Sequence, residues 1–247
     1  MEHIANLTVY NDGMRKSLLD KIWFLSKLDS SVKGIYDYGC ADGSLLEMAH
    51  TLFPDLSLWG YDFNPDMVAL AHERLPNATI STEPLYELDG LVVNASSVFH
   101  EVHAYSDNPG QDYDNIFEHG APYIAIRDMF YSEKSIHATN PVFLASVYQN
   151  QPIEKIREFE AFNGPISENK NFLHFLLTYR YTENWDREVR ENYFPHSLEE
   201  FLRKIPGEYQ VVHIEHYTLP FLRDCIFKDF GFTLADATHA KILLKKL

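Results

Sequence analysis

Residues 37–44 read DYGCADGS, and this stretch is the strongest indication of the fold in the sequence. It joins an apolar run at residues 34–38, which predicts a strand, to a helical pattern of apolar residues that starts at Leu45. Small residues in the turn between them allow positive φ angles and a close approach of the backbone to a ligand. The unpaired N–H groups at the start of the helix suit an anionic ligand group. We therefore predict a ligand-binding strand–turn–helix unit here.

A second strand is predicted to end at Asp62, after an alternating pattern in residues 56–61. Asn64-Pro65 then opens a helix, because proline suits the first helical position. Adjacent parallel strands end at the same edge of a sheet, so Asp62 and the turn that ends at Gly43 open into one crevice. A carboxylate in that place can accept two hydrogen bonds from a ribose diol.

The alternation of strands and helices continues along the chain. Residues 91–93 and 123–126 read as buried strands, with a helix or turn at 96–103 between them, and 210–214 and 241–244 read as late strands. Strands that alternate with helices form a parallel sheet with right-handed crossovers. We predict an α/β fold, a Rossmann-like doubly wound, mostly parallel sheet with helices on both faces.

Residues 130–205 have a different character. Apolar residues at helical spacing in 172–179 predict one helix, and the capping box at 197–200 predicts the start of another. This stretch holds eleven acidic and nine basic residues, whereas the whole chain has 36 against 21 and a net charge of −15. We interpret it as a helical insertion after the fourth parallel strand that covers the substrate.

Residues 37–44 resemble the first motif of class I S-adenosylmethionine-dependent methyltransferases, an acid followed by three alternate glycines. Asp37, Gly39 and Gly43 match that motif, and Ala41 replaces the middle glycine, which is tolerable if its φ angle is negative. The resemblance covers residues 34–130 and extends to the late strands. It implies S-adenosylmethionine as the cofactor and methyl transfer to oxygen or nitrogen of an acceptor as the activity.

The resemblance also implies which residues bind the cofactor. The turn faces its methionine and ribose, Asp62 holds the ribose hydroxyls, Phe63 lies beside the adenine, and residues 94–101 resemble the segment where the methyl group meets the acceptor. Cys40 contributes its backbone rather than its thiol. The implied set is Asp37, Gly39, Cys40, Ala41, Gly43, Asp62, Phe63, Asn94 and Ser96. The implied division is one domain, residues 1–247, with a cofactor-binding core at 30–129, the insertion at 130–205 and closing strands at 206–247.

A nicotinamide dinucleotide site is the alternative ligand for this turn. Its fingerprint, G-x-G-x-x-G, gives a pyrophosphate room, but here Asp42 stands inside the turn and would repel it. A cofactor that carries a sulfonium and an ammonium group suits this acid better. A purely structural turn would make the spacing to Asp62 accidental.

Two residues are candidates for catalysis. His100 suits proton transfer at neutral pH. Arg127 and Asp128 follow a strand at the end where such sheets bind ligands, so either residue can contact the substrate. A base is needed only if the acceptor carries a proton. The alternatives are structural roles, in which His100 hydrogen-bonds within the sheet edge and Asp128 pairs internally with Arg127. His100 and His103 lack a third metal ligand, so we expect no metal.

Three further segments can contact a ligand, but ordinary packing also explains each of them. The N-terminal segment folds over the cofactor in many relatives, which makes Tyr10 a candidate, although a packed helix explains it as well. Residues 179–181 and 183–185 mix aromatic and charged side chains that can clamp a substrate, but helix packing explains them too.

Composition limits the partners. A net charge of −15 disfavours nonspecific binding to nucleic acid or anionic membranes, so a small-molecule substrate is our first choice of acceptor. RNA stays an alternative through a local basic groove, and a non-catalytic module that binds S-adenosylmethionine is a further one. Two cysteines exclude a disulfide framework, and no run of about 18 apolar residues predicts a membrane span. With no secretory signal evident, we expect a cytoplasmic protein, and the sequence does not define its oligomeric state.

Overall fold

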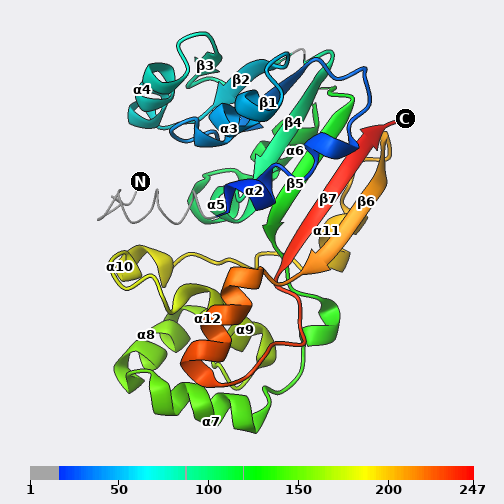
Figure 1. Ribbon diagram of the computed structural model, residues 1–247. Coiled ribbons are helices and arrows are strands. Elements are labelled where there is room, and N and C mark those ends of the chain that lie inside the picture. The colour runs from blue at the N-terminus through cyan, green and yellow to red at the C-terminus, as the bar shows by residue number, and fades with distance from the viewer. Residues whose placement is uncertain (1–16, 87, 119) are drawn as a thin grey trace.

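The computed structural model describes residues 17–86, 88–118 and 120–247 and contains a seven-stranded sheet of order β3-β2-β1-β4-β5-β7-β6 (Figure 1). Strands β1 to β5 run parallel, and β7 pairs antiparallel with both β5 and β6. The strands are β1 (Gly34–Tyr38), β2 (Ser57–Tyr61), β3 (Thr79–Ser81), β4 (Leu91–Ser96), β5 (Tyr123–Met129), β6 (Tyr209–Tyr217) and β7 (His239–Lys246). This confirms the predicted doubly wound, mostly parallel sheet. The sequence analysis missed the short strand β3.

Helices connect the strands and cover both faces of the sheet. Those around the sheet are α2 (Leu18–Lys21), η1 (Leu25–Lys27), α3 (Ser44–Leu52), α4 (Pro65–Arg74), α5 (Phe99–Tyr105), α6 (Pro109–Glu118) and α11 (Leu198–Arg203). Asn64 caps α4 and Ser197 caps α11, because each side chain accepts a hydrogen bond from a backbone N–H two or three residues later. Both predicted helix starts are confirmed.

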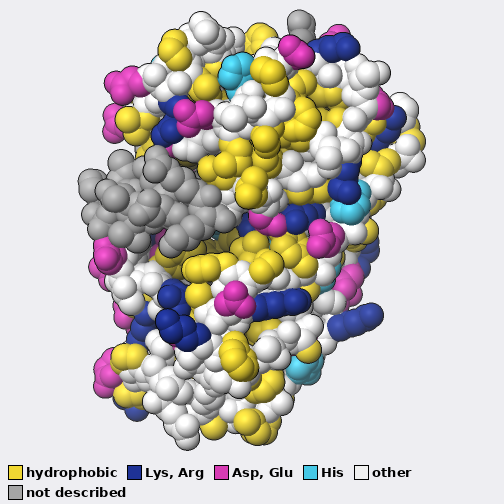
Figure 2. Space-filling view, viewed as in Figure 1, with side chains coloured by type: hydrophobic (Ala, Val, Ile, Leu, Met, Phe, Trp, Pro, Cys, Tyr) yellow, Lys and Arg dark blue, Asp and Glu magenta, His cyan; other side chains and the backbone are white. Residues whose placement is uncertain are grey.

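A helical unit lies beyond the carboxyl ends of the parallel strands (Figure 1). It consists of η2 (Glu133–Ser135), α7 (Pro141–Asn150), α8 (Ile153–Asn163), α9 (Asn169–Thr178), α10 (Trp185–Glu188) and α12 (Pro220–Phe230). Its core is built around Phe172, Phe175 and Leu176 of α9 together with Ile226 of α12. So α12 packs with these helices, although it comes from the segment expected to hold only closing strands. Figure 2 shows the molecule hollowed between the sheet and this unit.

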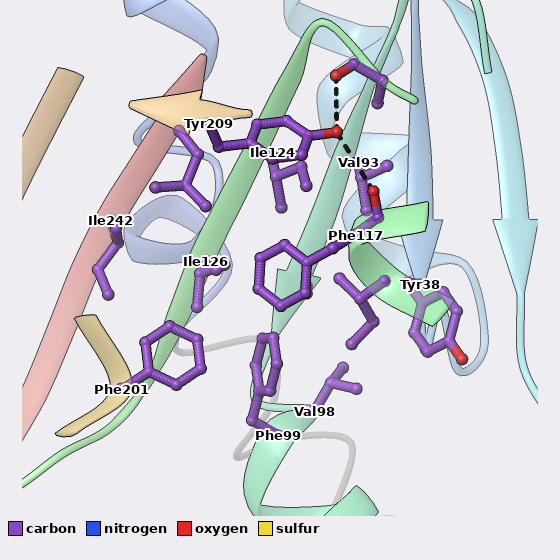
Figure 3. Packing of buried hydrophobic residues seen from close by; sticks show 14 of the residues in the cluster. Tyr38, Val93, Val98, Phe99, Phe117, Ile124, Ile126, Phe201, Tyr209 and Ile242 are labelled. Atoms are coloured by element: carbon purple, nitrogen blue, oxygen red, sulfur yellow. Dashed lines mark hydrogen bonds between the residues drawn. The ribbon is translucent and has the colours of Figure 1, made fainter. Parts of the chain in front are cut away.

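The sheet has a separate apolar core on each face, because neighbouring residues of a strand point to opposite sides. Ile35 packs with the core that contains α3 and α4, and Tyr36 with the core that contains α5, α6 and α11. In the second core the rings of Phe99, Phe117 and Phe201 pack beneath β5 (Figure 3). The two cores fix the sheet, and the polar residues at its carboxyl edge are left to form a site. No helix among the described residues is long and apolar enough to cross a membrane.

Candidate functional site

A cavity of about 1360 Å³ lies between the carboxyl edge of the sheet and the helical unit. The turn after β1, the end of β2, the loop after β4, helix α5 and segments of the helical unit contribute to its lining. Of the residues that the sequence implied for cofactor binding or catalysis, those that line it are Gly39, Ala41, Asp62, Phe63, Ser96 and His100. The structure therefore brings the predicted turn, the acid after β2 and the histidine of α5 to one space.

Backbone hydrogen bonds tie the turn after β1 to the end of β2. The N–H groups of Gly39 and Cys40 both donate to the Tyr61 carbonyl at 2.8 Å. The N–H of Ala41 donates to Asp62 Oδ2 at 2.9 Å, and that of Asn64 donates to Asp62 Oδ1 at 2.9 Å. Burial raises the pKa of Asp62, and the two N–H donors oppose that shift. Each carboxylate oxygen keeps acceptor capacity for a ligand.

The turn uses three residues with positive φ. Gly39 has φ +83°, and a Cβ there would lie 2.8 Å from Val98 Cγ2, so glycine is required both for conformation and for space. Ala41 has φ +46°, so the expectation of a negative angle at this position was wrong. The hydrogen bond to Asp62 holds the Ala41 N–H in this left-handed conformation.

A buried polar chain links β1 to β4. Asn94 Nδ2 donates to Asp37 Oδ1 at 2.6 Å, and Ser96 Oγ donates to Asn94 Oδ1 at 2.9 Å. Burial raises the pKa of Asp37 to about 7. Asp37 and Asn94 do not line the cavity, whereas Ser96 does. The first two residues thus position the turn and Ser96 from behind.

Asp42 takes a structural position that differs from the one expected. It accepts hydrogen bonds from the N–H and Oγ of Ser44 at the start of α3, and it pairs with Arg74 Nη2 at 2.7 Å. Since Arg74 already balances its charge and Asp42 does not line the cavity, it is not placed to meet a cationic cofactor group. A carboxylate at the start of α3 nevertheless leaves no favourable place for a pyrophosphate.

Cys40 and Gly43 also lie outside the cavity lining. A Cβ on Gly60 would lie 2.8 Å from Cys40 Sγ, so the thiol packs into the sheet. A Cβ on Gly43 would lie 3.2 Å from Ala71 Cβ, so this glycine allows α3 and α4 to approach. Both residues shape the turn through their backbone.

His100 and Asp128 form a buried pair. Asp128 Oδ2 accepts from the N–H of Phe99 at 2.8 Å, and Asp128 Oδ1 lies 2.7 Å from His100 Nδ1. Burial opposes the charged imidazole, but Asp128, Glu191 and Glu101 outweigh it and raise the pKa of His100 to about 9. His100 is therefore a cation at neutral pH. Asp128 does not line the cavity and instead orients His100.

An opposing wall of the cavity, formed by residues in and after α10, was not predicted from the sequence. Arg187 Nη2 lies 3.2 Å from Glu101 Oε1 and 3.3 Å from Glu191 Oε1, and Glu188 accepts a hydrogen bond from the Tyr193 hydroxyl. Burial raises the pKa of Glu191 to about 8. Helical periodicity gave no signal for the contact between Arg187 and Glu101, because these two residues are 86 positions apart in the chain.

Three side chains at this wall lie close enough together to be considered as ligands of a metal ion. One ligand atom each of His100, Glu101 and Glu191 lie within 4.8 Å of one another. The guanidinium of Arg187 already contacts both carboxylates, so it occupies the position that a cation would take. His103 is not part of this group, and its ring packs against that of His196 at 5.9 Å between centroids.

Other sequence candidates have different positions. Arg127 pairs with Asp20 at 3.0 Å rather than with Asp128. Arg180, Tyr181 and Asn184 line the cavity. Tyr10 lies outside the described residues.

Sequence comparison gives a short match. No protein-family model matches the chain. A stretch of 58 residues is 36% identical to trans-aconitate 2-methyltransferase from Yersinia pestis (strain Pestoides F). The aligned stretch covers 24% of this chain and 22% of that protein. The chain thus matches about a fifth of the length of this curated relative.

Structure comparison extends over the whole chain. The MccD protein has a TM-score of 0.54 at 11% identity, with 96% of this chain and 99% of that chain covered. Magnesium protoporphyrin IX methyltransferase (ChlM) from Synechocystis PCC 6803 with bound SAH has a TM-score of 0.53 at 12% identity, with 100% and 90% covered. The plantazolicin methyltransferase BpumL in complex with SAH has a TM-score of 0.51 at 13% identity, with 97% and 89% covered. At these identities the likeness shows the fold, which is that of the class I S-adenosylmethionine-dependent methyltransferases.

Proposed function

We propose that this chain, which has the class I methyltransferase fold, is an S-adenosylmethionine-dependent methyltransferase with a small-molecule acceptor. The hydrogen bond from the Ala41 N–H to Asp62 Oδ2 carries the proposal, because it holds the turn after β1 and the acid after β2 at one edge of the cavity. That arrangement suits a nucleoside joined to an amino acid. The short match to trans-aconitate 2-methyltransferase supports the same activity.

The cavity lining fits this cofactor. Asp62 accepts only one backbone hydrogen bond at each oxygen and can also accept from the two ribose hydroxyls. Phe63 is 53% exposed beside it and offers a ring face for adenine. Gly39 has no side chain to keep a ligand from the backbone of the turn. When bound, S-adenosylmethionine supplies an electrophilic methyl group on a sulfonium.

The residues of this chain then orient the acceptor and exclude water. Methyl transfer depends on in-line positioning, and a base is required only if the attacking atom carries a proton. Asp128 holds the proton of His100 at Nδ1, and the raised pKa keeps that proton in place at neutral pH. We therefore assign His100 to orienting the acceptor and Asp128 to positioning His100.

The cations of the cavity favour a small acceptor over RNA. Lys21 and Arg127 are buried, and Arg187 is engaged with Glu101 and Glu191. An RNA site would need an exposed basic stripe that can follow a phosphate backbone. The names of two similar proteins also specify small acceptors, trans-aconitate and magnesium protoporphyrin IX.

The helical segment at residues 130–205 is proposed to cover the acceptor. Leu177, Tyr181 and Asn184 of this segment line the cavity opposite the turn after β1. The division into a cofactor-binding core at residues 30–129 and closing strands at 206–247 belongs to the same proposal. The cytoplasmic location stays a prediction from the sequence.

Calorimetric titration with S-adenosylmethionine, SAH and NADH tests the proposal. We expect both S-adenosyl compounds to bind with one-to-one stoichiometry and NADH to give no heat. Transfer of a labelled methyl group to trans-aconitate and other small acids then tests turnover. Binding of NADH instead of SAH would contradict the proposal, and SAH binding with no transfer to any acceptor would favour the non-catalytic module.

A further inference from the structure

Three basic side chains line the cavity where α2 meets the ends of β5 and β7. They are Lys21, Arg127 and Lys241, which we call the cationic floor. Asp20 is the acid between them: its Oδ2 lies 3.0 Å from Arg127 Nε and its Oδ1 lies 2.7 Å from Lys241 Nζ. One carboxylate thus bridges two cations, and the Tyr217 hydroxyl donates a third hydrogen bond to it.

Arg127 is the residue whose bonding is incomplete. Its side chain is buried, with the residue only 3% exposed. Nε bonds Asp20 and Nη1 bonds Ser97 Oγ at 3.1 Å, but Nη2 has no hydrogen-bond partner in the part of the chain that the structure describes. Buried guanidinium donors are normally satisfied, because leaving one unmatched is unfavourable. This donor therefore calls for an acceptor oxygen.

Two further acids act on the cations of the floor, and the surroundings of each weaken its effect. Burial and the repulsion of Arg127 lower the pKa of Lys21 to about 8. The charge of Asp37 raises the pKa of Lys21, but burial raises the pKa of Asp37 itself to about 7, so this acid is only partly charged near neutrality. Glu215 lies 3.6 Å from Lys241, with its side chain 48% exposed to solvent.

The acids on the opposing wall contact other groups of that wall. Glu101 and Glu191 share Arg187, and His100 lies 4.0 Å from Glu191. Glu188 accepts from Tyr193. The described acids of the wall thus have partners on the wall itself, whereas Arg127 Nη2 on the floor has no hydrogen-bond partner among the described residues.

We propose that the cationic floor binds an anionic oxygen group of the methyl acceptor, with Arg127 as the specificity-determining residue. This inference rests on the proposed function and adds the class of substrate, a small acid that carries a carboxylate or a phosphate. Guanidinium groups bind both through charge-assisted hydrogen bonds. Bound in this way, the anion anchors the acceptor at the floor while the rest of it extends toward the turn after β1.

Calorimetry on the SAH-loaded protein tests this with three probes. Citrate supplies carboxylates, inorganic phosphate supplies the other oxyanion, and triethyl citrate is the neutral counterpart of citrate. We expect citrate or phosphate to bind and triethyl citrate not to bind. Arg127→Gln should lower the affinity of the bound anion at least tenfold, and Arg127→Lys should lower it less because the charge remains. Arg223→Gln, at an exposed arginine of α12, should change it less than twofold.

Comparison of citrate with phosphate identifies the anionic group of the acceptor, because the probe that binds more tightly carries the matching group. Equal binding of triethyl citrate, or an anion affinity that Arg127→Gln leaves unchanged, would overturn the inference. SAH affinity is measured on every variant as a control for folding. Loss of SAH binding in both the Arg127→Gln and the Arg127→Lys proteins would indicate that the substitutions disrupt the fold. If SAH fails to bind even the unaltered protein, the proposed function fails, and the same titration on the free protein still decides whether the floor binds an anion.

Discussion

The two halves of the cavity are built in different ways. In the half proposed to bind the cofactor, Ala41 of the turn after β1 reaches Asp62 across 21 residues, and backbone N–H groups make the connection. In the acceptor half, Asp20 reaches Arg127 across 107 residues and Tyr217 across 197. Backbone geometry shapes the first half, and pairing between distant side chains shapes the second. Substitutions should therefore act through conformation in one half and through charge in the other.

Gly39→Val should have the largest effect and tests the conformational half. A branched side chain at φ +83° is strained by about 1–3 kcal/mol, and its contact with Val98 adds overpacking of about 1–3 kcal/mol. We expect a loss of roughly 3 kcal/mol or more in the free energy of unfolding, together with loss of SAH binding. Urea unfolding and calorimetry measure both. Gly207→Val is the control, because nothing lies within 4 Å of a Cβ there. Equal effects at both glycines would show that the turn is not constrained.

Asp128→Asn tests the half governed by charge. A shift in the pKa of His100 from 6.5 to about 9 corresponds to an effect on the order of 3 kcal/mol, so we expect a loss of about 2–3 kcal/mol in the free energy of unfolding. Because the folded-state pKa is raised, this stabilisation is complete below about pH 6.5 and disappears as the pH rises through 9. The variant should therefore differ most from wild type at pH 6 and least at pH 10.

Nuclear magnetic resonance titration of His100 checks the cause directly, since its pKa should fall in the Asp128→Asn protein. Asp224→Asn, at an exposed acid of α12, is the matched control and should leave both measurements unchanged. A stability loss of the same size at pH 6 and pH 10 would mean that Asp128 acts only by capping the N–H of Phe99.

How much the sequence predicted follows the same division. The sequence could predict that Gly39 and Asp62 lie together at the edge of the sheet, because a turn and a strand end leave signals in neighbouring residues. The three-residue strand β3 is too short to show a period, and α12 was missed because its partners are Phe172 and Phe175 of a distant helix. The sequence could not reveal the roles of the acceptor half, since they depend on which distant side chains meet.

Two predicted residues illustrate the limit more closely. Asp42 was expected beside the ligand because it stands inside the turn, yet Arg74, 32 residues later, draws it to the outer side. Asp128 was a candidate for contact with the substrate because it follows a predicted strand, yet it lies within β5 and turns toward His100. Position along the chain predicted which loop each acid occupies, while its partner decided which way it faces.

Asp62→Ala comes next in size and separates the cofactor from the fold. The variant loses the acceptor for the ribose hydroxyls, so we expect SAH affinity to fall by about 1–3 kcal/mol. Calorimetry measures this against Asp66→Asn, an exposed acid in the first turn of α4. An unchanged SAH affinity would contradict the placement of the ribose beside Asp62 at the end of β2.

Ala41→Gly should have the smallest effect and should be favourable. Alanine at φ +46° costs roughly 1 kcal/mol relative to a residue without a Cβ, while glycine costs about 0.5–1 kcal/mol in the unfolded chain. The net gain should therefore be under about 1 kcal/mol in the free energy of unfolding. Ala49→Gly, in the interior of α3, should instead lose about 1 kcal/mol, because no strain is relieved there. Urea unfolding measures the change in the free energy of unfolding for both variants. The two changes have opposite signs if the hydrogen bond to Asp62 imposes the left-handed turn. They have the same sign if Ala41 adopts an ordinary helical or extended backbone.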